Sequence, residues 1–251
     1  MSARRPEVGK VPLDSVTLDE ALDRICQLVR DGNGGSVFTP NVDHVVLAEQ
    51  VPEFAEAYQR CSLSLVDGVP VLLAARAMGY PIKAKVSGSD LLWPLLLRAQ
   101  REGHSVYFLG GAEGSSALVL ERLARDLPKL RVVGADAPWI DLTAPRDSQL
   151  ATVEKIRDKS PDLLIVGLGA PKQELWTFRY QSLLGHTVCL GLGASIDFLA
   201  GRVRRAPRIM SDYGFEWLFR LALEPRRLAH RYLLRDPLFA KIVLQQVISK
   251  M

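Results

Sequence analysis

The segment from Pro161 to Trp176 constrains the fold more than any other part of the chain. It reads P-D-L-L-I-V-G-L-G-A-P-K-Q-E-L-W. Its four consecutive apolar residues, Leu163 to Val166, are typical of a strand buried on both faces of a parallel sheet. Gly167 and Gly169 end the strand, and Pro171 favours the start of a helix. The segment therefore predicts a strand, a glycine-rich turn and a helix, as in an α/β protein.

A glycine-rich turn of this kind suits phosphate, because it exposes backbone N–H groups at the positive end of a helix. Lys172 adds a mobile cation, and the amide of Gln173 can donate or accept a hydrogen bond at a sugar or base edge. Gly-x-Gly turns are common, so an ordinary strand-to-helix turn with a surface lysine is the alternative. The full run of Lys172, Gln173, Glu174 and Trp176 after G-L-G-A-P is far less generic.

Strand and helix patterns alternate along most of the chain. This order predicts a doubly wound, mostly parallel sheet with a Rossmann-like core. The other expected strands are Ser36 to Phe38, Ser62 to Val66, Val106 to Leu109, Arg131 to Val133 and Thr187 to Leu190.

Further glycine turns follow two of these strands. Strand, glycine turn, helix, strand and then an acid is half of a dinucleotide-binding pattern, in which the acid binds a ribose hydroxyl. The turn is G-G-x-x-G, which departs from the usual G-x-G-x-x-G and suits a nucleotide without specifying which. We expect a nucleotide-binding site to draw on Gly110, Gly111, Gly114, Asp136, Gly167, Gly169, Lys172, Gln173, Gly193 and Asp197.

Three polar residues follow two other predicted strands. Thr39 and Asn41 come after Phe38, and Asp67 comes after Val66. The carboxyl ends of strands are where open α/β sheets bind ligands, so these side chains are candidates for chemistry. Asp-Gly is also a turn signal, and an aspartate there is more often a cap than a catalyst.

Composition limits the remaining possibilities. Three widely spaced cysteines form no C-x-x-C pair, so neither a disulfide framework nor a zinc site is expected. No apolar run approaches the roughly 20 residues of a spanning helix, and the polar N-terminus lacks a secretory signal. We expect a cytoplasmic protein that needs no cofactor.

The basic charge of the chain is concentrated near its end. Nine arginines lie between Arg202 and Arg235 against three acids, although the whole chain carries a net charge of only +4. Aromatic and leucine residues accompany them. We therefore divide the chain into an α/β core, residues 1–202, and a helical appendage, residues 203–251. The appendage could pack on the core, on a partner subunit or on a membrane interface, and the excess of arginine favours binding to anionic lipid or diphosphate.

Several blocks in this order resemble the WecG/TagA/CpsF family of bacterial glycosyltransferases over nearly the whole chain. The blocks are T-P-N (39–41), D-G-V-P (67–70), S-G-S-D (87–90), F-L-G-G-A-E-G (108–114), P-D-L-L-I-V-G-L-G-A-P-K-Q-E-L-W (161–176), G-L-G-A-S-I-D-F-L-A-G (191–201), R-A-P (205–207) and E-W-L-F-R-L-A-L-E-P-R-R (216–227).

The resemblance implies an inverting hexosyltransferase that moves a sugar, such as N-acetylmannosamine, from a UDP-sugar to a polyprenyl-diphosphate-linked sugar. Such enzymes act at the inner face of the membrane and build teichoic acids, other cell-wall polymers and exopolysaccharides. The resemblance also suggests that the chain associates with copies of itself. It implies that Asp67 is the base, with Thr39, Asn41 and Gln173 beside the reaction. It also implies that acceptor diphosphate and membrane contact Arg220, Arg227 and Arg231.

The chain contains no D-x-D pair, so we expect a metal-independent enzyme. Two other classes stay open at this stage. An NAD(P)-binding oxidoreductase would explain the glycine turns and Asp136, and a basic module binding nucleic acid would explain the arginines; we expect no nucleic acid as a partner.

Overall fold

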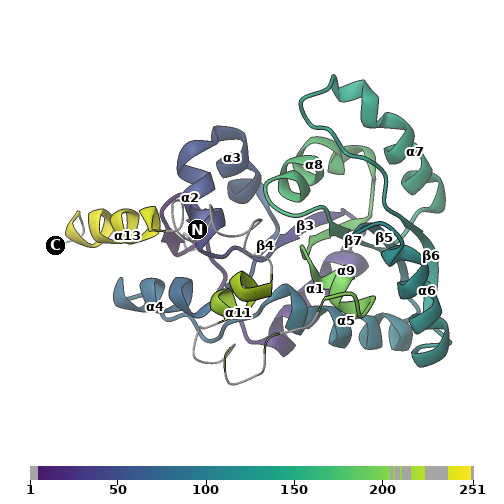
Figure 1. The fold of residues 1–251 in the computed structure, drawn as a ribbon, viewed down its shortest axis with the longest axis horizontal. Helices are drawn as coiled ribbons and strands as arrows, with labels where there is room; N and C mark the ends of the chain where they lie inside the picture. Colours follow the sequence, from purple (N-terminus) through teal and green to yellow (C-terminus); the bar gives the residue numbers. More distant parts are fainter. Residues whose placement is uncertain (1–4, 204–205, 207–209, 211–215, 224–236, 250–251) are drawn as a thin grey trace. The chain divides into compact units, whose positions relative to one another are not determined.

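The structure is a computed structural model of the chain that describes residues 5–203, 206, 210, 216–223 and 237–249. The chain forms two compact units (Figure 1). The first unit comprises Met1–Thr17, Thr39–Ser87 and Arg205–Met251, and the second comprises Leu18–Phe38 and Gly88–Arg204. Each unit therefore draws on segments that are distant in the sequence.

The second unit is built on parallel strands in the order β3-β8-β7-β5-β6. Its central strand is the apolar run of the sequence, whose first four residues are buried. Such runs fit the middle of a parallel sheet because both faces of the strand are covered. The strands are β3 (Gly35–Phe38), β5 (Ser105–Gly110), β6 (Arg131–Asp136), β7 (Leu163–Gly167) and β8 (Val188–Gly191).

Helices cover both faces of these strands, as Figure 1 shows. On one face, Trp176 and Tyr180 pack in a buried cluster with Leu164 and Val166 of β7. On the other face, Ile196 lies against Gly167. The helices of this unit are α1 (Leu18–Asp31), α5 (Gly88–Glu102), α6 (Ser115–Asp126), α7 (Leu150–Lys159), α8 (Lys172–Tyr180) and α9 (Ser195–Leu199).

Within its described residues, the first unit is mostly helical, with three very short strands. Its α2 carries a run of six buried residues, Asp43 to Ala48, which fixes it in the interior of the unit. The elements are β1 (Glu7–Val8), β2 (Val11–Pro12), α2 (Val42–Gln50), α3 (Pro52–Arg60), β4 (Leu63–Ser64), α4 (Val69–Ala77), α11 (Glu216–Leu223) and α13 (Leu238–Ile248).

The last helix, α13, is attached to the N-terminal residues of the same unit. The Gln246 side chain accepts a hydrogen bond from the Gly9 N–H (2.8 Å) and donates one to the Glu7 carbonyl (2.9 Å). A groove of about 630 Å³ lies between α13 and α2. The proposed division into 1–202 and 203–251 stays a prediction, but this helix is bonded to residues near the start of the chain.

The α/β class and the parallel sheet predicted from the sequence are confirmed. Some boundaries were wrong. Strand β4 covers only Leu63–Ser64, and Leu65 continues as a single bridge to Asp14. Strand β6 extends to Asp136, which is its last residue and does not lie beyond it. The basic appendage is not confirmed, because most of its arginines fall outside the described residues.

Candidate active site

The polar residues of the first unit are held together by a backbone hydrogen bond. The Asp67 N–H donates to the Pro40 carbonyl at 2.9 Å, which places Asp67 beside the T-P-N segment. Gly68 follows with a φ of +103°, a conformation that glycine adopts without strain, and α4 begins at the next residue. The structure thus brings the backbone of Asp67 beside the segment that contains Thr39 and Asn41. The roles assigned to these three residues stay predictions.

Asn41 is also the cap of α2. Its side-chain oxygen accepts from the Asp43 N–H at 3.1 Å, which satisfies one of the backbone donors left unpaired at a helix start. The ring of His44 contacts the same oxygen at 2.7 Å. Sequence reasoning missed His44. The signal available was a histidine at the third helical position after an Asn cap, the position of the partner in a capping box.

The glycine turns of the second unit lie after two neighbouring strands. Gly110 of β5 pairs with Gly167 of β7, and the Gly111 N–H donates to the Gly167 carbonyl at 2.9 Å. Gly110, Gly111 and Gly114 have φ values of +102°, +87° and +77°, which disfavour other residues. The structure therefore brings the two turns together at the carboxyl ends of the strands, where nucleotides bind in such sheets.

Asp197 links one glycine turn to the segment after β8. Its carboxylate accepts from the Ala112 N–H (2.8 Å) and from the Ser115 hydroxyl (2.7 Å). The same oxygen makes both contacts, and a Cβ at Gly111 would lie 3.4 Å from it. Asp197 thus organises the G-G-x-x-G turn. Its predicted contact with a nucleotide sugar stays a prediction.

Gln173 is almost fully buried at the start of α8. Its side-chain oxygen accepts from the Gly193 N–H (2.9 Å), and its amide nitrogen donates to Glu174 (2.7 Å). It therefore joins the turn after β7 to Gly193 after β8. Gly169, with a φ of +73°, and a cis peptide bond between Ala170 and Pro171 precede it.

Lys172 lies beside an exposed tryptophan that sequence reasoning missed. Its ammonium group donates to the Ile140 carbonyl (3.1 Å) and lies 5.1 Å from the centre of the Trp139 ring. Trp139 is 85% exposed, while its neighbour Ile140 is buried. The loop is also held by Arg179, which donates to the Leu142 carbonyl at 2.9 Å. A loop that is hydrogen-bonded to α8 thus presents a large aromatic ring. The signal in the sequence was a tryptophan in a proline-flanked polar segment.

Asp136, the predicted ribose-binding acid, already has protein partners. It forms an ion pair with Lys155 at 2.6 Å and accepts a hydrogen bond from the Tyr107 hydroxyl. Burial alone would raise the pKa of Asp136, but these two partners outweigh burial and lower it below its usual range. Burial and the neighbouring carboxylate in turn raise the pKa of Tyr107. A role of Asp136 in binding ribose stays a prediction.

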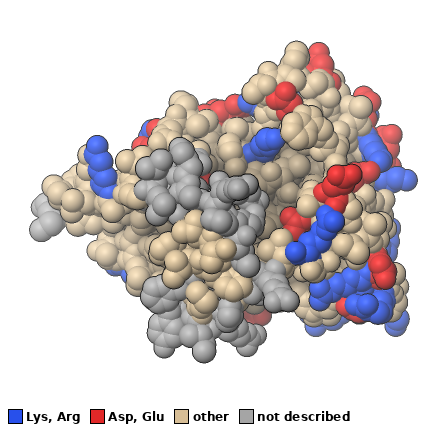
Figure 2. All heavy atoms as spheres, in the orientation of Figure 1, with Lys and Arg blue, Asp and Glu red and all other residues tan. Residues whose placement is uncertain are grey.

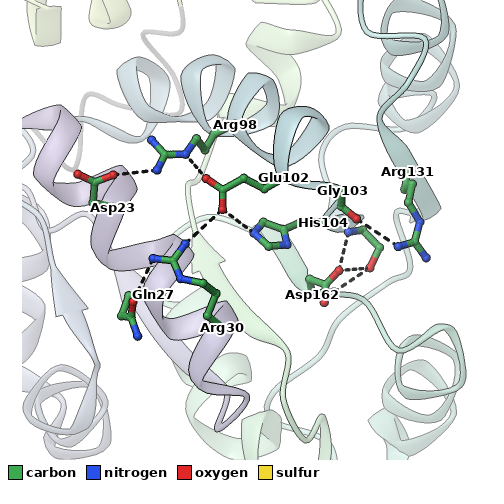
Figure 3. A network of polar contacts seen from close by, with 10 residues as sticks. Asp23, Gln27, Arg30, Arg98, Glu102, Gly103, His104, Arg131 and Asp162 are labelled. Atoms are coloured by element: carbon green, nitrogen blue, oxygen red, sulfur yellow. Dashed lines mark hydrogen bonds and ion pairs between the residues drawn. The ribbon is translucent and has the colours of Figure 1, made fainter.

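Among the described residues, one group has the donor types of a metal site. Donor atoms of Cys26, Glu102 and His104 lie within 4.8 Å of one another. Figure 3 shows that Glu102 also contacts Arg98 and Arg30, the latter at 3.3 Å. Two positively charged guanidinium groups on one carboxylate would repel a divalent cation and compete with it for the carboxylate oxygens. Burial, followed by the nearby Glu102, raises the pKa of the Cys26 thiol, whereas metals bind thiolate. This cluster therefore ties α1 to α5.

Most of the arginines predicted to bind the acceptor lie outside the residues that the structure describes. Arg227 and Arg231 are not among the described residues, and Arg220 belongs to α11 but its side chain is not described. On the visible face of the second unit, Figure 2 shows basic and acidic side chains intermingled. No helix within the described residues is long and apolar enough to cross a membrane.

Comparison with known proteins identifies the family. Residues 6–251 match the glycosyl transferase WecG/TagA/CpsF family. The chain belongs to this family. It is 30% identical over 212 residues (84% of this chain, 79% of the relative) to an N-acetylglucosaminyldiphosphoundecaprenol N-acetyl-beta-D-mannosaminyltransferase of Bacillus spizizenii. An enzyme of the same name from Bacillus subtilis is 25% identical over 244 residues (97% and 92%).

The family assignment confirms the resemblance seen in the sequence motifs, and it identifies the chain as a glycosyltransferase. It decides against the NAD(P)-binding oxidoreductase that the glycine turns had left open. The G-G-x-x-G turn and the turn after β7 thus belong to a transferase that shares the strand–turn–helix geometry of dinucleotide-binding proteins.

Proposed function

We propose that this chain transfers N-acetylmannosamine from its UDP derivative, with inversion, to N-acetylglucosamine carried on a polyprenyl diphosphate. The proposal draws on the activity for which the two relatives are named. The observation that supports it is the backbone hydrogen bond from Asp67 to Pro40, because it brings residue Asp67 beside the segment that contains Thr39 and Asn41. An inverting transfer needs a single base in such a position.

In this mechanism Asp67 takes the proton of the acceptor hydroxyl as its oxygen attacks the anomeric carbon of the donor. The bond between that carbon and the UDP oxygen breaks, and its electron pair leaves with the β-phosphate. Thr39 and Asn41 orient the reacting sugars. Orientation of this kind lowers the barrier because the entropy of alignment is lost on binding and not in the reaction.

The leaving UDP needs donors for its developing charge. Backbone N–H groups of the turns at Gly110–Gly114 and Gly167–Gly169, both at the carboxyl end of the sheet, are suited to phosphate. Lys172 supplies a positive charge beside the second turn. Trp139 offers a flat exposed surface on which a uracil ring can stack. With donors of this kind, the reaction needs no metal, and transfer should continue in excess EDTA.

The acceptor is held in a membrane, so the enzyme must work at the membrane surface. We assign this task to the basic segment of residues 203–251, with Arg220, Arg227 and Arg231 binding diphosphate and lipid phosphate. Arginine suits this role because its planar fork binds two phosphate oxygens, which lysine does not. Changing these three residues to lysine should therefore preserve binding to anionic vesicles better than it preserves transfer.

Truncation at residue 203 is a poor test of this assignment, because it would also remove α13 and the bonds of Gln246 to Gly9 and Glu7. Point substitutions avoid that damage. If the three lysine variants transferred sugar at the normal rate, these arginines would have no specific role at the diphosphate.

The decisive experiment is a donor screen with a short-chain lipid-diphosphate N-acetylglucosamine as acceptor. UDP-N-acetylmannosamine should be consumed with release of UDP and formation of a disaccharide lipid. UDP-glucose and the uronic acid derivatives serve as competing donors. Transfer from another UDP-sugar alone would replace the donor in this proposal, and absence of transfer from every UDP-sugar would overturn it.

A further inference from the structure

Two buried polar side chains at the start of α8 have no part in the proposed mechanism. Gln173 is 3% exposed, and Glu174 beside it is 0% exposed. Both lie in the first turn of the helix, where the positive end of the helix dipole favours a carboxylate. Burying an amide and a carboxylate is unfavourable unless they form hydrogen bonds, so their partners indicate what the pair does.

The contacts of Gln173 determine which end of its side-chain amide is which. The atom that accepts from the Gly193 N–H at 2.9 Å must be the oxygen. The other atom is therefore the nitrogen, and it donates to a carboxylate oxygen of Glu174 at 2.7 Å. One side chain thus connects Glu174 in α8 to the backbone after β8. Because Gln173 is almost fully buried, little of its surface is open to a ligand.

The segment after β8 lies against both of the other glycine turns. A Cβ at Gly167 would lie 2.9 Å from the Gly193 carbonyl oxygen, so the two backbones are in close contact. Further along the same segment, Asp197 accepts from the Ala112 N–H of the G-G-x-x-G turn at 2.8 Å. A displacement of Gly193 would therefore disturb the turn after β7 directly and the turn after β5 through Asp197.

We propose that Gln173 and Glu174 are a positioning pair that sets the turn after β8, and that Gln173 acts on nucleotide affinity through Gly193. The inference rests on the proposed function for the identity of the nucleotide, which is UDP. It adds a role for Glu174 and assigns Gln173 an indirect one. The requirement is an acceptor for the Gly193 N–H together with a donor and an acceptor that face each other at positions 173 and 174.

The first test is Gln173→Glu, which keeps an oxygen for Gly193 but puts a second carboxylate against Glu174. Two buried carboxylates in contact repel each other, so the bond to Gly193 should be lost. UDP affinity, measured by calorimetry, should weaken about tenfold, the scale of one lost buried hydrogen bond. The Gly193 N–H should also exchange faster with deuterium in an NMR experiment, a readout that needs no ligand.

The decisive test adds Glu174→Gln to Gln173→Glu, which exchanges the two side chains. The carboxylate then accepts from the Gly193 N–H and from the NH2 group at position 174, so every bond of the pair is restored in the reverse sense. UDP affinity should return to within about threefold of the wild type, because the coupling of the two changes cancels the loss. The slow exchange of the Gly193 N–H should return as well. A ligand contact through the NH2 group of Gln173 would not be restored by this exchange.

Gln27→Glu is the matched control. Gln27 is an exposed residue of α1 whose amide nitrogen donates to a carboxylate oxygen of Asp31 at 2.5 Å. The substitution makes the same change of charge beside a carboxylate, but in solvent. UDP affinity should stay within about twofold, because exposed charges interact weakly.

The inference is overturned if Gln173→Glu is folded and binds UDP normally, or if adding Glu174→Gln restores nothing. It is also overturned if Gln27→Glu weakens UDP binding as much as Gln173→Glu. If Gln173→Glu does not fold, the double variant decides alone, since it should fold and bind UDP. If the wild type transfers no sugar, the proposed function fails, and the exchange of the Gly193 N–H still decides whether the pair positions the turn.

Discussion

The two units offer different chemical groups for binding a ligand. In the first unit the candidate groups are side chains, those of Thr39, Asn41 and Asp67, placed by a helix cap and one backbone hydrogen bond. In the second unit the candidate groups are largely backbone N–H groups of turns whose glycines have positive φ, although those of Gly111 and Ala112 already donate to Gly167 and Asp197. Side chains supply proton transfer, whereas backbone donors supply fixed partial charge, so the first unit should set turnover and the second should set nucleotide affinity.

The largest expected effect comes from removing the carboxylate of the first unit. Asp67→Asn keeps the size of the side chain and the backbone bond to Pro40 but cannot accept the proton. We expect kcat to fall by about 10²-fold or more, the usual scale for loss of a general base. UDP affinity, measured by calorimetry, should be unchanged. Normal turnover of this variant would show that Asp67 is not the base. It would also contradict the proposal that the first unit sets turnover.

The next prediction concerns the side chain that connects the loops of the second unit. Gln173→Leu removes the acceptor of the Gly193 N–H and the donor to Glu174, both in a buried setting. Leaving buried polar groups unpaired costs about 1 to 3 kcal/mol each. We expect a lower free energy of unfolding in urea and a UDP affinity about tenfold weaker. A loss of kcat with unchanged UDP affinity would show that Gln173 belongs functionally with the side chains of the first unit.

A matched pair of glycine substitutions tests whether the turn itself matters. A Cβ at Gly111 would lie 2.9 Å from Ile196, in a backbone conformation with φ of +87°. Gly103 has a similar φ of +77°, but nothing lies within 4 Å of its Cβ position. Gly103→Ala should therefore show backbone strain alone, about 1 kcal/mol, and Gly111→Ala about 1 kcal/mol more from crowding.

Only Gly111→Ala should also weaken UDP binding, because Gly103 follows α5 and lies outside the turns. Equal losses of stability and of UDP affinity in both variants would mean that the turn after β5 is an ordinary structural turn. The measurement is urea unfolding of each variant with and without saturating UDP.

The same contrast explains what the sequence could predict. The apolar run Leu163–Val166 and its flanking glycines predicted strand β7 and the start of α8 correctly, because both signals are local. Asp67 beside Thr39 could be expected because residues at carboxyl ends of strands share an edge. The partners of Asp197 could not be predicted, because its contacts with Ala112 and Ser115 depend on which strands are neighbours in the sheet.

Two other features were beyond the sequence for the same reason. The chain enters the second unit at Leu18, leaves after Phe38 and returns at Gly88, which only the packing of distant helices decides. Trp139 was missed because a single tryptophan reads as a core residue, and only the structure shows that its ring is exposed while the next residue is buried. Local sequence patterns predict helices and strands, whereas the exposure of a side chain and its hydrogen-bond partners depend on the assembled fold.

The smallest expected effect concerns Asp136, the acid that the nucleotide-binding pattern had singled out. Its folded-state pKa is lowered by Lys155 and Tyr107, so it should stabilise the fold above its unfolded pKa of about 4 and lose that contribution as the pH falls through the lower folded value. Lys155→Met removes the ion pair. Because the Lys155 side chain is 58% exposed, the loss at pH 7 should be only about 0.5 kcal/mol. The loss should shrink as the pH approaches 3, and UDP affinity should stay constant if Asp136 serves only the protein. A clear change of UDP affinity in Lys155→Met would instead place Asp136 at the ribose, and the second unit would then bind its ligand through side chains as well as through its backbone.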